Sequence, residues 1–235
     1  MNITPIKTRI FHEGEPLLDF LVKYLPRLKE KAVVVVTSKI VALAERRTAK
    51  FTTERAKTKL IKQESDWAVR TRYCWLTLRD GAVMPSAGID ESNGQGKLIL
   101  LPRDAFQSAK TLWLALRRHY KLKQLGVLIT ESRTMPLRAG TIALALGYAG
   151  FYGIRDYRGK RDLFGRKFEY SRVNVADSLA TAAVLTMGEG NERQPLAVIQ
   201  GALVVFTNRV NKRESFISLQ DDMFRPLFTR LLRKQ

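Results

Sequence analysis

The stretch AVVVVT at residues 32–37 decides the fold class of this 235-residue chain, because it strings β-branched residues together without polar alternation. Such a continuous apolar run is typical of a strand buried on both faces, whereas a half-exposed strand alternates apolar and polar residues. Ser38 follows at once, and residues 40–45 have a composition that permits a helix. A buried strand leading into a helix indicates a protein that mixes α and β structure.

Similar signals on both sides of this run extend the prediction to a whole sheet with helices. We expect a mixed α/β fold, with mixed or antiparallel sheets and flanking helices. One domain should span residues 1–235, because no linker or repeat divides the chain. The expected strands are residues 97–101, 126–130 and one or two more within 197–206; the expected helices are residues 15–24, 108–120 and 176–187, with a solvated, charged helix over residues 46–72.

The charge balance is strongly basic. Lysine and arginine total 41 against 22 aspartate and glutamate residues, which gives a formal net charge of +19. This charge attracts polyanions, so an RNA- or polyanion-binding protein is one hypothesis. The basic residues are dispersed, however, and no RNP, KH or double-stranded RNA motif occurs. A solvated basic surface is the favoured interpretation, and nucleic acid is not an expected partner.

The cysteine, histidine and apolar patterns argue against a disulfide framework, a zinc site and a membrane protein. Cys74 is the one cysteine, and His12 and His119 are isolated. The most apolar stretch, residues 141–154, is shorter than the about 20 residues of a membrane helix. The N-terminus has no basic and apolar leader. We therefore expect a cytoplasmic protein without membrane contact.

The first segment that can carry chemistry is AGIDESN at residues 87–93. Its carboxylates and amide beside Gly88 suit a hard cation with phosphate, because Mg²⁺ prefers oxygen ligands. The simpler interpretation is an Asx-type turn whose side chains satisfy their own backbone.

The second segment, TESR at residues 130–133, directly follows an apolar strand. Polar groups at the carboxyl end of a buried strand are well placed for a crevice site. A helix N-cap or a solvated loop is the alternative. Arg133 and Arg138 nearby are suited to hold phosphate or a substrate carboxylate by bidentate hydrogen bonds.

The third segment, MGEGNE at residues 187–192, closes the predicted helix that precedes it. Gly188 and Gly190 are suited either to end that helix or to present backbone amides to a nucleotide. The segment is not a P-loop, and no GxGxxG follows a strand, so a Rossmann fingerprint is excluded.

Taken in order, these segments and others resemble one family. The matching blocks are VVVVTSK (33–39), AE (44–45), GID with SN (88–93), LLP with a later SA (100–109), VLITES (127–132), PLRAG (136–140), DYRGKRDLFGR (156–166), VAD (175–177) and MGEG (187–190). Together they resemble the coenzyme F-420:L-glutamate ligases, which add γ-linked glutamate to a deazaflavin coenzyme. The resemblance covers nearly the whole chain, and DYRGKRDLFGR is its most specific block.

The resemblance implies a reaction and an assembly. GTP phosphorylates the carboxylate of an acceptor such as F-420-0, and the amine of L-glutamate then attacks the acyl phosphate. Two divalent cations, Mg²⁺ or Mn²⁺, assist, with K⁺ as a further possible ion. The family fold implies intertwined subunits in a homodimer.

The resemblance also implies roles for particular residues. Asp90, Glu131 and Arg138 correspond to catalytic positions. The implied metal ligands are Asp90, Glu131, Ser132 and Met187. The implied nucleotide contacts are Thr8, Arg9, Ile10, Phe11, Ser38, Lys39, Asn93, Leu185, Thr186, Met187, Gly188, Glu189, Gly190, Asn191 and Glu192.

Some positions depart from the family pattern near these residues. Glu131 stands where the family usually has Asp, Leu43 where some members have a nucleotide-binding Lys, and Arg46 where the family has Gly. Residues 134–136 read TMP in place of GRP. A divergent member with another acceptor is therefore a serious alternative, and a folate-like acceptor also ends in a glutamate γ-carboxylate. The number and linkage of added glutamates, and a preference for GTP over ATP, stay open.

Overall fold

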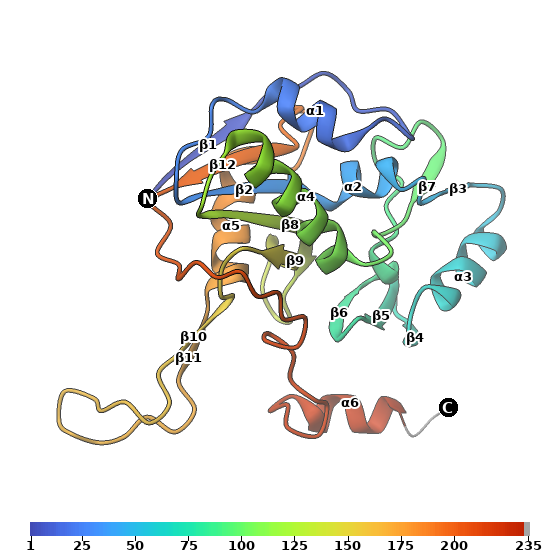
Figure 1. The fold of residues 1–235 in the computed structure, drawn as a ribbon. Coiled ribbons are helices and arrows are strands. Elements are labelled where there is room, and N and C mark those ends of the chain that lie inside the picture. The colour runs from blue at the N-terminus through green and yellow to red at the C-terminus, as the bar shows by residue number, and fades with distance from the viewer. Residues whose placement is uncertain (233–235) are drawn as a thin grey trace. The chain divides into compact units, whose positions relative to one another are not determined.

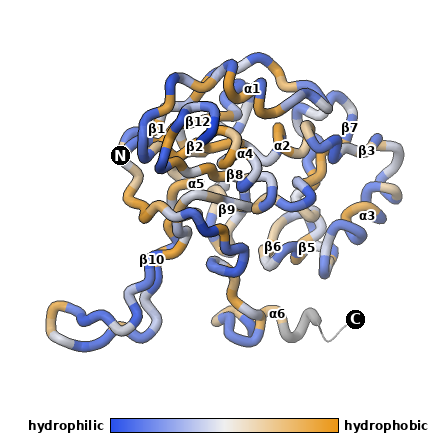
Figure 2. The backbone as a smooth tube through the Cα atoms, viewed as in Figure 1, coloured by the Kyte–Doolittle hydropathy of each residue, from blue (hydrophilic) through white to orange (hydrophobic). Residues whose placement is uncertain are grey.

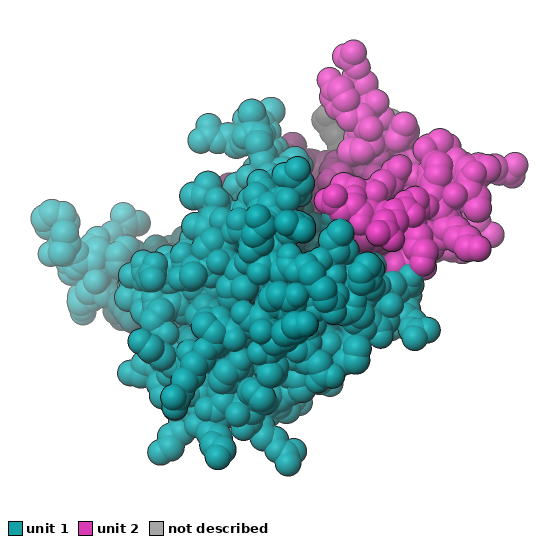
Figure 3. Space-filling view, turned by 90° about the horizontal axis from the view of Figure 1, so that it is seen from above, with its two compact units in different colours: residues 1–47, 102–214 teal, residues 48–101, 215–235 magenta. Residues whose placement is uncertain are grey.

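The computed structural model describes the backbone of residues 1–232 and the side chains of residues 1–228. The chain divides into two compact units, and Figure 3 distinguishes them by colour. Unit 1 contains residues 1–47 and 102–214, and unit 2 contains residues 48–101 and 215–235. Unit 2 is thus formed by a segment inserted into unit 1 together with the C-terminal segment.

Unit 1 is built on a five-stranded mixed sheet (Figure 1). The central pair, β2 and β8, is parallel, with Thr37 opposite Thr130, and the other neighbouring strands pair antiparallel. This arrangement confirms the expected mixed α/β class. In spatial order the strands are β1 (Asn2–Ile6), β12 (Leu196–Gln200), β2 (Ala32–Thr37), β8 (Leu125–Thr134) and β9 (Thr141–Ala149).

Helices cover both faces of this sheet, which explains why the central strand lacks polar alternation. Val34 and Val36 pack into a cluster that contains residues of α1, α2 and α4. Val33 and Val35 pack on the opposite face against α5. All four valines are 0% exposed, so each contributes roughly 1.5–3 kcal/mol through burial. The helices are α1 (Leu17–Tyr24), α2 (Ser38–Ala44), α4 (Ala105–Tyr120) and α5 (Val175–Met187).

A hairpin arm extends from unit 1 between β9 and α5 (Figure 1). Its strands are β10 (Ile154–Asp156) and β11 (Arg172–Asn174), which pair antiparallel. The block DYRGKRDLFGR lies in this arm, and Figure 2 shows the arm as mainly hydrophilic with an apolar stretch at its tip. Leu163 and Phe164 in that stretch are 97% and 95% exposed.

Unit 2 has a small core of its own around Ile61, Leu98 and Leu100. A well-buried ion pair between Arg79 and Glu64, at 2.8 Å, adds to it. Its elements are β3 (Thr48–Lys50), α3 (Glu54–Gln63), β4 (Trp67–Arg70), β5 (Trp75–Arg79), β6 (Ala82–Pro85), the short 3-10 helix η1 (Ser86–Gly88), β7 (Lys97–Ile99) and α6 (Arg225–Leu232).

Two expectations about secondary structure need correction. Residues 46–72 do not form one helix, because residues 48–50 and 67–70 pair with neighbouring strands and only residues 54–63 are helical. The strand expected within 197–206 covers Leu196–Gln200, and Gly201 follows it with a φ of +70° that a strand does not adopt. In the part of the chain that the structure describes, no helix is long and apolar enough to cross a membrane.

Candidate functional site

At the carboxyl end of β2, the neighbouring strand β8 brings two sequence-predicted residues together. Because the strands run parallel in register, Ser38 and Glu131 follow paired residues, Thr37 and Thr130. The Ser38 hydroxyl donates a hydrogen bond to the Glu131 carboxylate, and Ser38 is only 3% exposed. These residues lie 93 positions apart in the chain. The sheet topology therefore creates the contact.

The loop after α5 reaches the same edge. The Ser132 hydroxyl donates to the Glu189 carboxylate, with its oxygen 2.6 Å and 2.8 Å from the two carboxylate oxygens. The Ser132 backbone N–H also donates to Oε1 of Glu131 at 3.2 Å. Strand β8 and the 188–192 loop thus share one hydrogen-bonded cluster of oxygen atoms. We call this cluster the oxygen edge and define it as Ser38, Glu131, Ser132 and Glu189.

Glycine geometry shapes the loop itself. Gly188 has a φ of +84°, and its amide donates to the Val184 carbonyl at 2.9 Å, so it does end the helix. A side chain here would place its Cβ 2.4 Å from the carboxyl carbon of Glu192. The Gly190 amide donates to the same carboxylate at 2.8 Å. Gly188 therefore ends the helix, and the amides of both glycines are hydrogen-bonded within the chain; the contact of this loop with a nucleotide stays a prediction.

The segment after β1 lies beside this loop. The Thr8 N–H donates to the Arg193 carbonyl at 2.9 Å, and Thr8 is 5% exposed. The Arg9 guanidinium is held by Glu15, 2.8 Å from Oε1, and by the Ile10 carbonyl at 2.7 Å. The guanidinium lowers the pKa of Glu15 to about 2.

Several residues that were predicted to contact the nucleotide have side chains that pack in the core or bond to the backbone. Phe11 packs edge-on against Phe20 in the core, with ring centroids 4.9 Å apart, and the Met187 side chain is 2% exposed in the cluster beneath α5. The Thr186 hydroxyl donates to the Ala183 carbonyl at 2.8 Å. Ile10 and Leu185 are solvent-exposed apolar residues. Only main-chain atoms of Phe11 and Met187 remain to contact a ligand.

Asp90 and Asn93 belong to unit 2, where they form a local turn. The two oxygens of Asp90 accept from the Ser92 N–H at 2.7 Å and the Ser92 hydroxyl at 2.9 Å. Asp90 also exchanges backbone hydrogen bonds with Ile99, and Glu91 forms an ion pair with Lys57. Asn93 has a φ of +56°, which its residue type tolerates well. This geometry is that of the Asx-type turn.

Arg138 lies in the exposed turn between β8 and β9. Its amide donates to the Met135 carbonyl at 3.3 Å, and the preceding residue, Leu137, has a φ of +57°. Arg138 lies between Thr134 and Thr141, which form the last pair of the two strands.

Asp177, in the VAD block, anchors α5 to the sheet. It accepts hydrogen bonds from the Ala145 N–H at 2.9 Å and from the Asn174 carboxamide at 2.7 Å. The Asn174 side chain in turn accepts from the Asp177 N–H at 3.0 Å and caps the helix. Burial is the main cause that raises the pKa of Asp177, against the lowering effects of these hydrogen bonds and of Arg133.

Buried polar atoms without a partner lie near the same edge of the sheet, and one of them, in Gln194, was missed by sequence reasoning. Within the described residues, Thr130 Oγ1 and Gln194 Oε1 are buried without a hydrogen-bond partner, as is Arg133 Nε. Thr130 precedes Glu131 on β8, and Gln194 shortly precedes β12, which pairs with β2 at the same edge. An unsatisfied buried polar group costs about 1–3 kcal/mol, so these atoms favour a bound polar ligand there. Thr130 lies inside the VLITES block, but nothing in the sequence singled out Gln194.

The oxygen edge has the donor chemistry of a hard cation. Mg²⁺ and Mn²⁺ prefer carboxylate, hydroxyl and carbonyl oxygens, and Glu131, Glu189, Ser38 and Ser132 supply the first two types. Within residues 1–232 no group of three or more His, Cys, Asp or Glu side chains is arranged to hold a metal. The residues therefore fit a cation that keeps water or phosphate oxygens among its ligands.

Comparison with known proteins identifies the family. The family model for F420-0:Gamma-glutamyl ligase matches residues 5–201. The coenzyme F420:L-glutamate ligase of Archaeoglobus fulgidus is 30% identical over 243 residues, covering 95% of this chain and 95% of that protein. The protein of that name from Methanococcus maripaludis strain S2 is 36% identical over 147 residues, 63% of this chain and 58% of that protein. The one from Methanothermobacter thermautotrophicus is 43% identical over 141 residues, 59% of this chain and 56% of that protein.

Two of these matches span little more than half of the relative's length, whereas the match to the Archaeoglobus protein spans nearly all of it. The family model covers most of the chain, and its range contains the oxygen edge and the glycine loop. The protein therefore belongs to the F420-0:gamma-glutamyl ligase family.

Proposed function

We propose that this protein is a GTP- and divalent-metal-dependent ligase that joins the amine of L-glutamate to an acceptor carboxylate through an acyl phosphate. Membership of the family and the names of the relatives, coenzyme F420:L-glutamate ligases, support the glutamate-adding part of this proposal. The nucleotide, the cations and the phosphorylated intermediate follow from the family resemblance.

The observation that carries the proposal is the oxygen edge beside the glycine loop. Residues from three separate segments meet there: Ser38 after β2, Glu131 and Ser132 in β8, and Glu189 after α5. Carboxylate and hydroxyl oxygens bind Mg²⁺ or Mn²⁺, and the amides of a glycine loop suit phosphate oxygens. A bound cation would supply charge neutralisation to the transferring phosphoryl group.

The chain's own residues then have assigned tasks. Glu131 and Ser132 hold the cation, with Ser38 orienting the Glu131 carboxylate through its hydrogen bond. Residues 187–192 hold the nucleotide mainly through main-chain groups, which explains why the buried side chain of Met187 is compatible with a site role. Asp90 and Asn93 in unit 2 are assigned to metal and nucleotide by the family resemblance.

We further propose an acceptor that resembles F-420-0, with a folate-like acceptor as the alternative. Both present a carboxylate to be activated and both fit a glutamate-adding enzyme. The replacement of the usual Asp by Glu131 and the TMP sequence at residues 134–136 lie close to the oxygen edge. Because these changes from the family pattern lie near the proposed cation site, more than one acceptor should be tested.

A homodimer is also part of the proposal. The exposed apolar side chains at the tip of the arm, Leu163 and Phe164, are the type of residue that association buries. Sedimentation at micromolar concentration should give twice the chain mass of 26.8 kDa. A monomer under these conditions would exclude an intertwined assembly.

The direct test is a product assay. The protein is incubated with GTP, Mn²⁺, L-glutamate and a panel containing F-420-0, folate and a carboxylate-free analogue. Mass spectrometry should show the addition of glutamyl units to one carboxylate acceptor, with GDP and phosphate released. The Glu131→Gln protein serves as the inactive control. Absence of any glutamylated product across the panel would remove the ligase proposal.

A further inference from the structure

A second site lies at the opposite end of the unit 1 sheet. A cavity of about 270 Å³ is lined there by Leu125, the first residue of β8, and by Gly150, which follows β9. Val127 near this end pairs with Ala149, whereas Glu131 pairs with Leu144 further along the hairpin. The cavity is therefore separate from the oxygen edge and takes no part in the proposed reaction.

Backbone contacts build the wall of this cavity from a distant segment. Phe206 bridges to Phe151, and the Thr207 N–H donates to the Gly150 carbonyl at 3.0 Å. A Cβ on Gly150 would lie 2.1 Å from the Leu125 carbonyl oxygen and 2.5 Å from Trp113 Nε1. Glycine at this position therefore lets residues 206–208 and α4 close around the same space.

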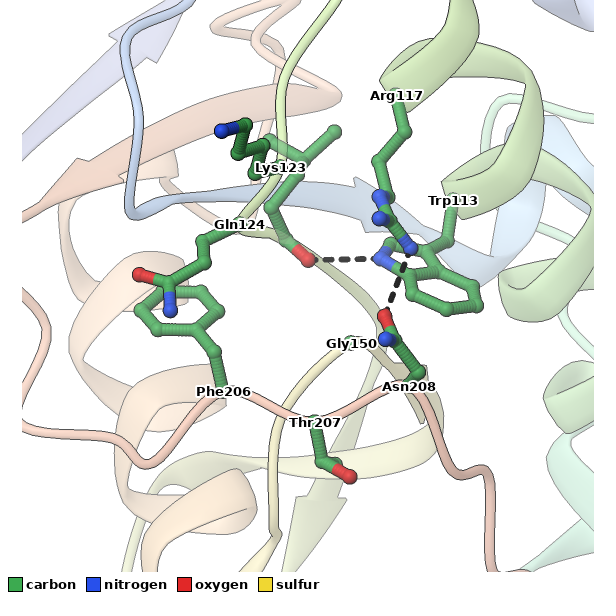
Figure 4. A pocket seen from close by; sticks show the side chains of 9 residues that line it. Trp113, Arg117, Lys123, Gln124, Gly150, Phe206, Thr207 and Asn208 are labelled. Carbon is green, nitrogen blue, oxygen red and sulfur yellow. Dashed lines mark hydrogen bonds between the residues drawn. The ribbon is translucent and has the colours of Figure 1, made fainter.

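Each polar side chain of the lining carries at least one hydrogen-bond donor, and no lining residue is acidic. Figure 4 shows Arg117 and Gln124 on opposite sides of the opening, with Thr207 below and Lys123 at the rim. The complete polar lining is Arg117, Lys123, Gln124, Thr207 and Asn208. A lining with two cations and no carboxylate favours an anionic ligand.

Arg117 is fixed in place with donor capacity left over. Its Nη1 donates to Asn208 Oδ1 at 2.9 Å, and its Nε lies 3.5 Å from the Leu122 carbonyl. Its guanidinium carbon lies 4.7 Å from the centre of the Trp113 ring. Nη2 has no partner among the described residues, and the same holds for the Lys123 ammonium and the Gln124 carboxamide.

The loop that carries Lys123 and Gln124 is also held by the fold. Both of its backbone N–H groups donate to the Glu30 carboxylate at 2.8 Å. These hydrogen bonds are the main cause of the lowered pKa of Glu30, with smaller contributions from the charges of Lys123 and Arg117. Glu30 thus positions the loop from behind and does not line the cavity.

The remaining lining is apolar and rigid. Trp113 donates its indole N–H to the Leu125 carbonyl at 2.8 Å, so its polar group is satisfied and its ring serves as a wall. Leu125 and Phe206 complete this surface. Ligand sites typically combine such apolar walls with a few fixed polar groups, and a volume of this size fits a small molecule.

We propose that this cavity binds a small organic anion. Its phosphate or carboxylate group is held by Arg117 and Gln124 with Lys123 at the rim, and its apolar part lies against Phe206 and Leu125. The Trp113 indole N–H reports occupancy directly, because it forms part of the wall.

Titration with phenyl phosphate, followed by the ¹⁵N-resolved signal of the Trp113 indole, tests this proposal. Benzoate replaces the phosphate by a carboxylate, inorganic phosphate lacks the apolar part, and benzyl alcohol lacks the charge. We expect phenyl phosphate or benzoate to shift the signal saturably, and the better of the two identifies the preferred anionic group. Inorganic phosphate and benzyl alcohol should bind more weakly than either.

The paired variant Lys123→Gln with Gln124→Leu should weaken binding about tenfold, as expected for the loss of charge-assisted hydrogen bonds. Both side chains are exposed, and the Glu30 contacts use their backbone, so folding is preserved. Arg117→Lys tests the guanidinium separately. Lys110→Gln, on the exposed side of α4, removes one charge outside the cavity and should leave binding unchanged. An unmoved indole signal with both aromatic anions, or equal weakening in Lys110→Gln, would overturn the proposal.

Discussion

The oxygen edge of unit 1 and the Asp90 turn of unit 2 both gather carboxylates and hydroxyls, but they are held together differently. Ser38 and Glu131 meet across 93 residues, and Ser132 meets Glu189 across 57. Asp90 instead bonds to Ser92, two residues away. A cluster held by long-range contacts requires the whole sheet, whereas a local turn needs only its own sequence. The former is therefore stronger structural support for a site.

The largest effect should come from Glu131→Gln. The variant keeps the shape of the side chain but removes the charge that holds the cation. Turnover should fall by about 10²–10³, or roughly 3–4 kcal/mol of transition-state stabilisation. Steady-state glutamylation with saturating Mn²⁺ measures the change, with circular dichroism as the check on folding. Turnover within a factor of two of the native protein would place the cation elsewhere.

Asp90→Asn tests whether the unit 2 turn also binds the cation. If the carboxylate binds the cation, turnover should also fall, because the transition state loses several kcal/mol of stabilisation. The melting temperature of the metal-free protein should be nearly unchanged or raised. If Asp90 serves only the turn, activity should be retained and stability should change by about 1 kcal/mol through the Ser92 hydrogen bonds. Measuring turnover and metal-free melting on this one variant separates the two roles. Full activity would remove Asp90 from the site.

The central strand and the oxygen edge show how much of the structure can be predicted from the sequence alone. The valine run 33–36 predicted the doubly covered central strand, because full burial on both faces leaves a pattern in the chain itself. The contact between Ser38 and Glu131 could not be derived from spacing, because it depends on strands being parallel and in register. Family resemblance nevertheless placed both residues among the site candidates.

Other site residues were beyond prediction for related reasons. Phe11 stays a predicted nucleotide contact through its main chain only, since its ring belongs to the core. The sequence could not show this, because an apolar residue in a loop has no periodicity to reveal its direction. Gln194 was missed, since its buried carbonyl oxygen depends on how its segment enters β12. The mixed character of residues 46–72 was hidden because their short strands pair with partners outside the segment.

Gly188→Ala should have an intermediate effect. The φ of +84° costs an alanine about 1–2 kcal/mol, and its Cβ would also meet the Glu192 carboxyl group. Stability should therefore fall by more than in Gly96→Ala, whose φ of +80° is similar but whose surroundings are open. Urea unfolding of both variants isolates the steric part. Equal losses would mean that Glu192 moves aside and that the loop is not constrained.

The smallest effect concerns pH and the anchor of α5. Burial raises the pKa of Asp177 above its ordinary value of 3.8, so the native state retains this proton to higher pH than the unfolded chain. The contribution of Asp177 to the free energy of unfolding should therefore fall as pH rises from below 3.8 through its folded pKa, whereas Glu15 and Asp156, whose pKa values are lowered, contribute in the opposite direction. Relative to the native protein, Asp177→Asn should therefore gain stability as pH rises through this range, whereas Asp19→Asn, at an exposed position, should keep the native pH dependence. Parallel urea unfolding across acidic pH decides the point, and identical curves for Asp177→Asn and the native protein would contradict it.

If one edge of the unit 1 sheet binds nucleotide and cation together, the two ligands should stabilise the protein jointly, which differential melting measures. Native protein and Glu131→Gln are melted alone, with GTP, with Mn²⁺ and with both. Ligand at one hundred times its Kd stabilises the native state by about 2.7 kcal/mol. We expect a rise in melting temperature with GTP and Mn²⁺ together that exceeds the sum of the separate rises and is lost in Glu131→Gln. No rise with both ligands, or an equal rise in the two proteins, would contradict it.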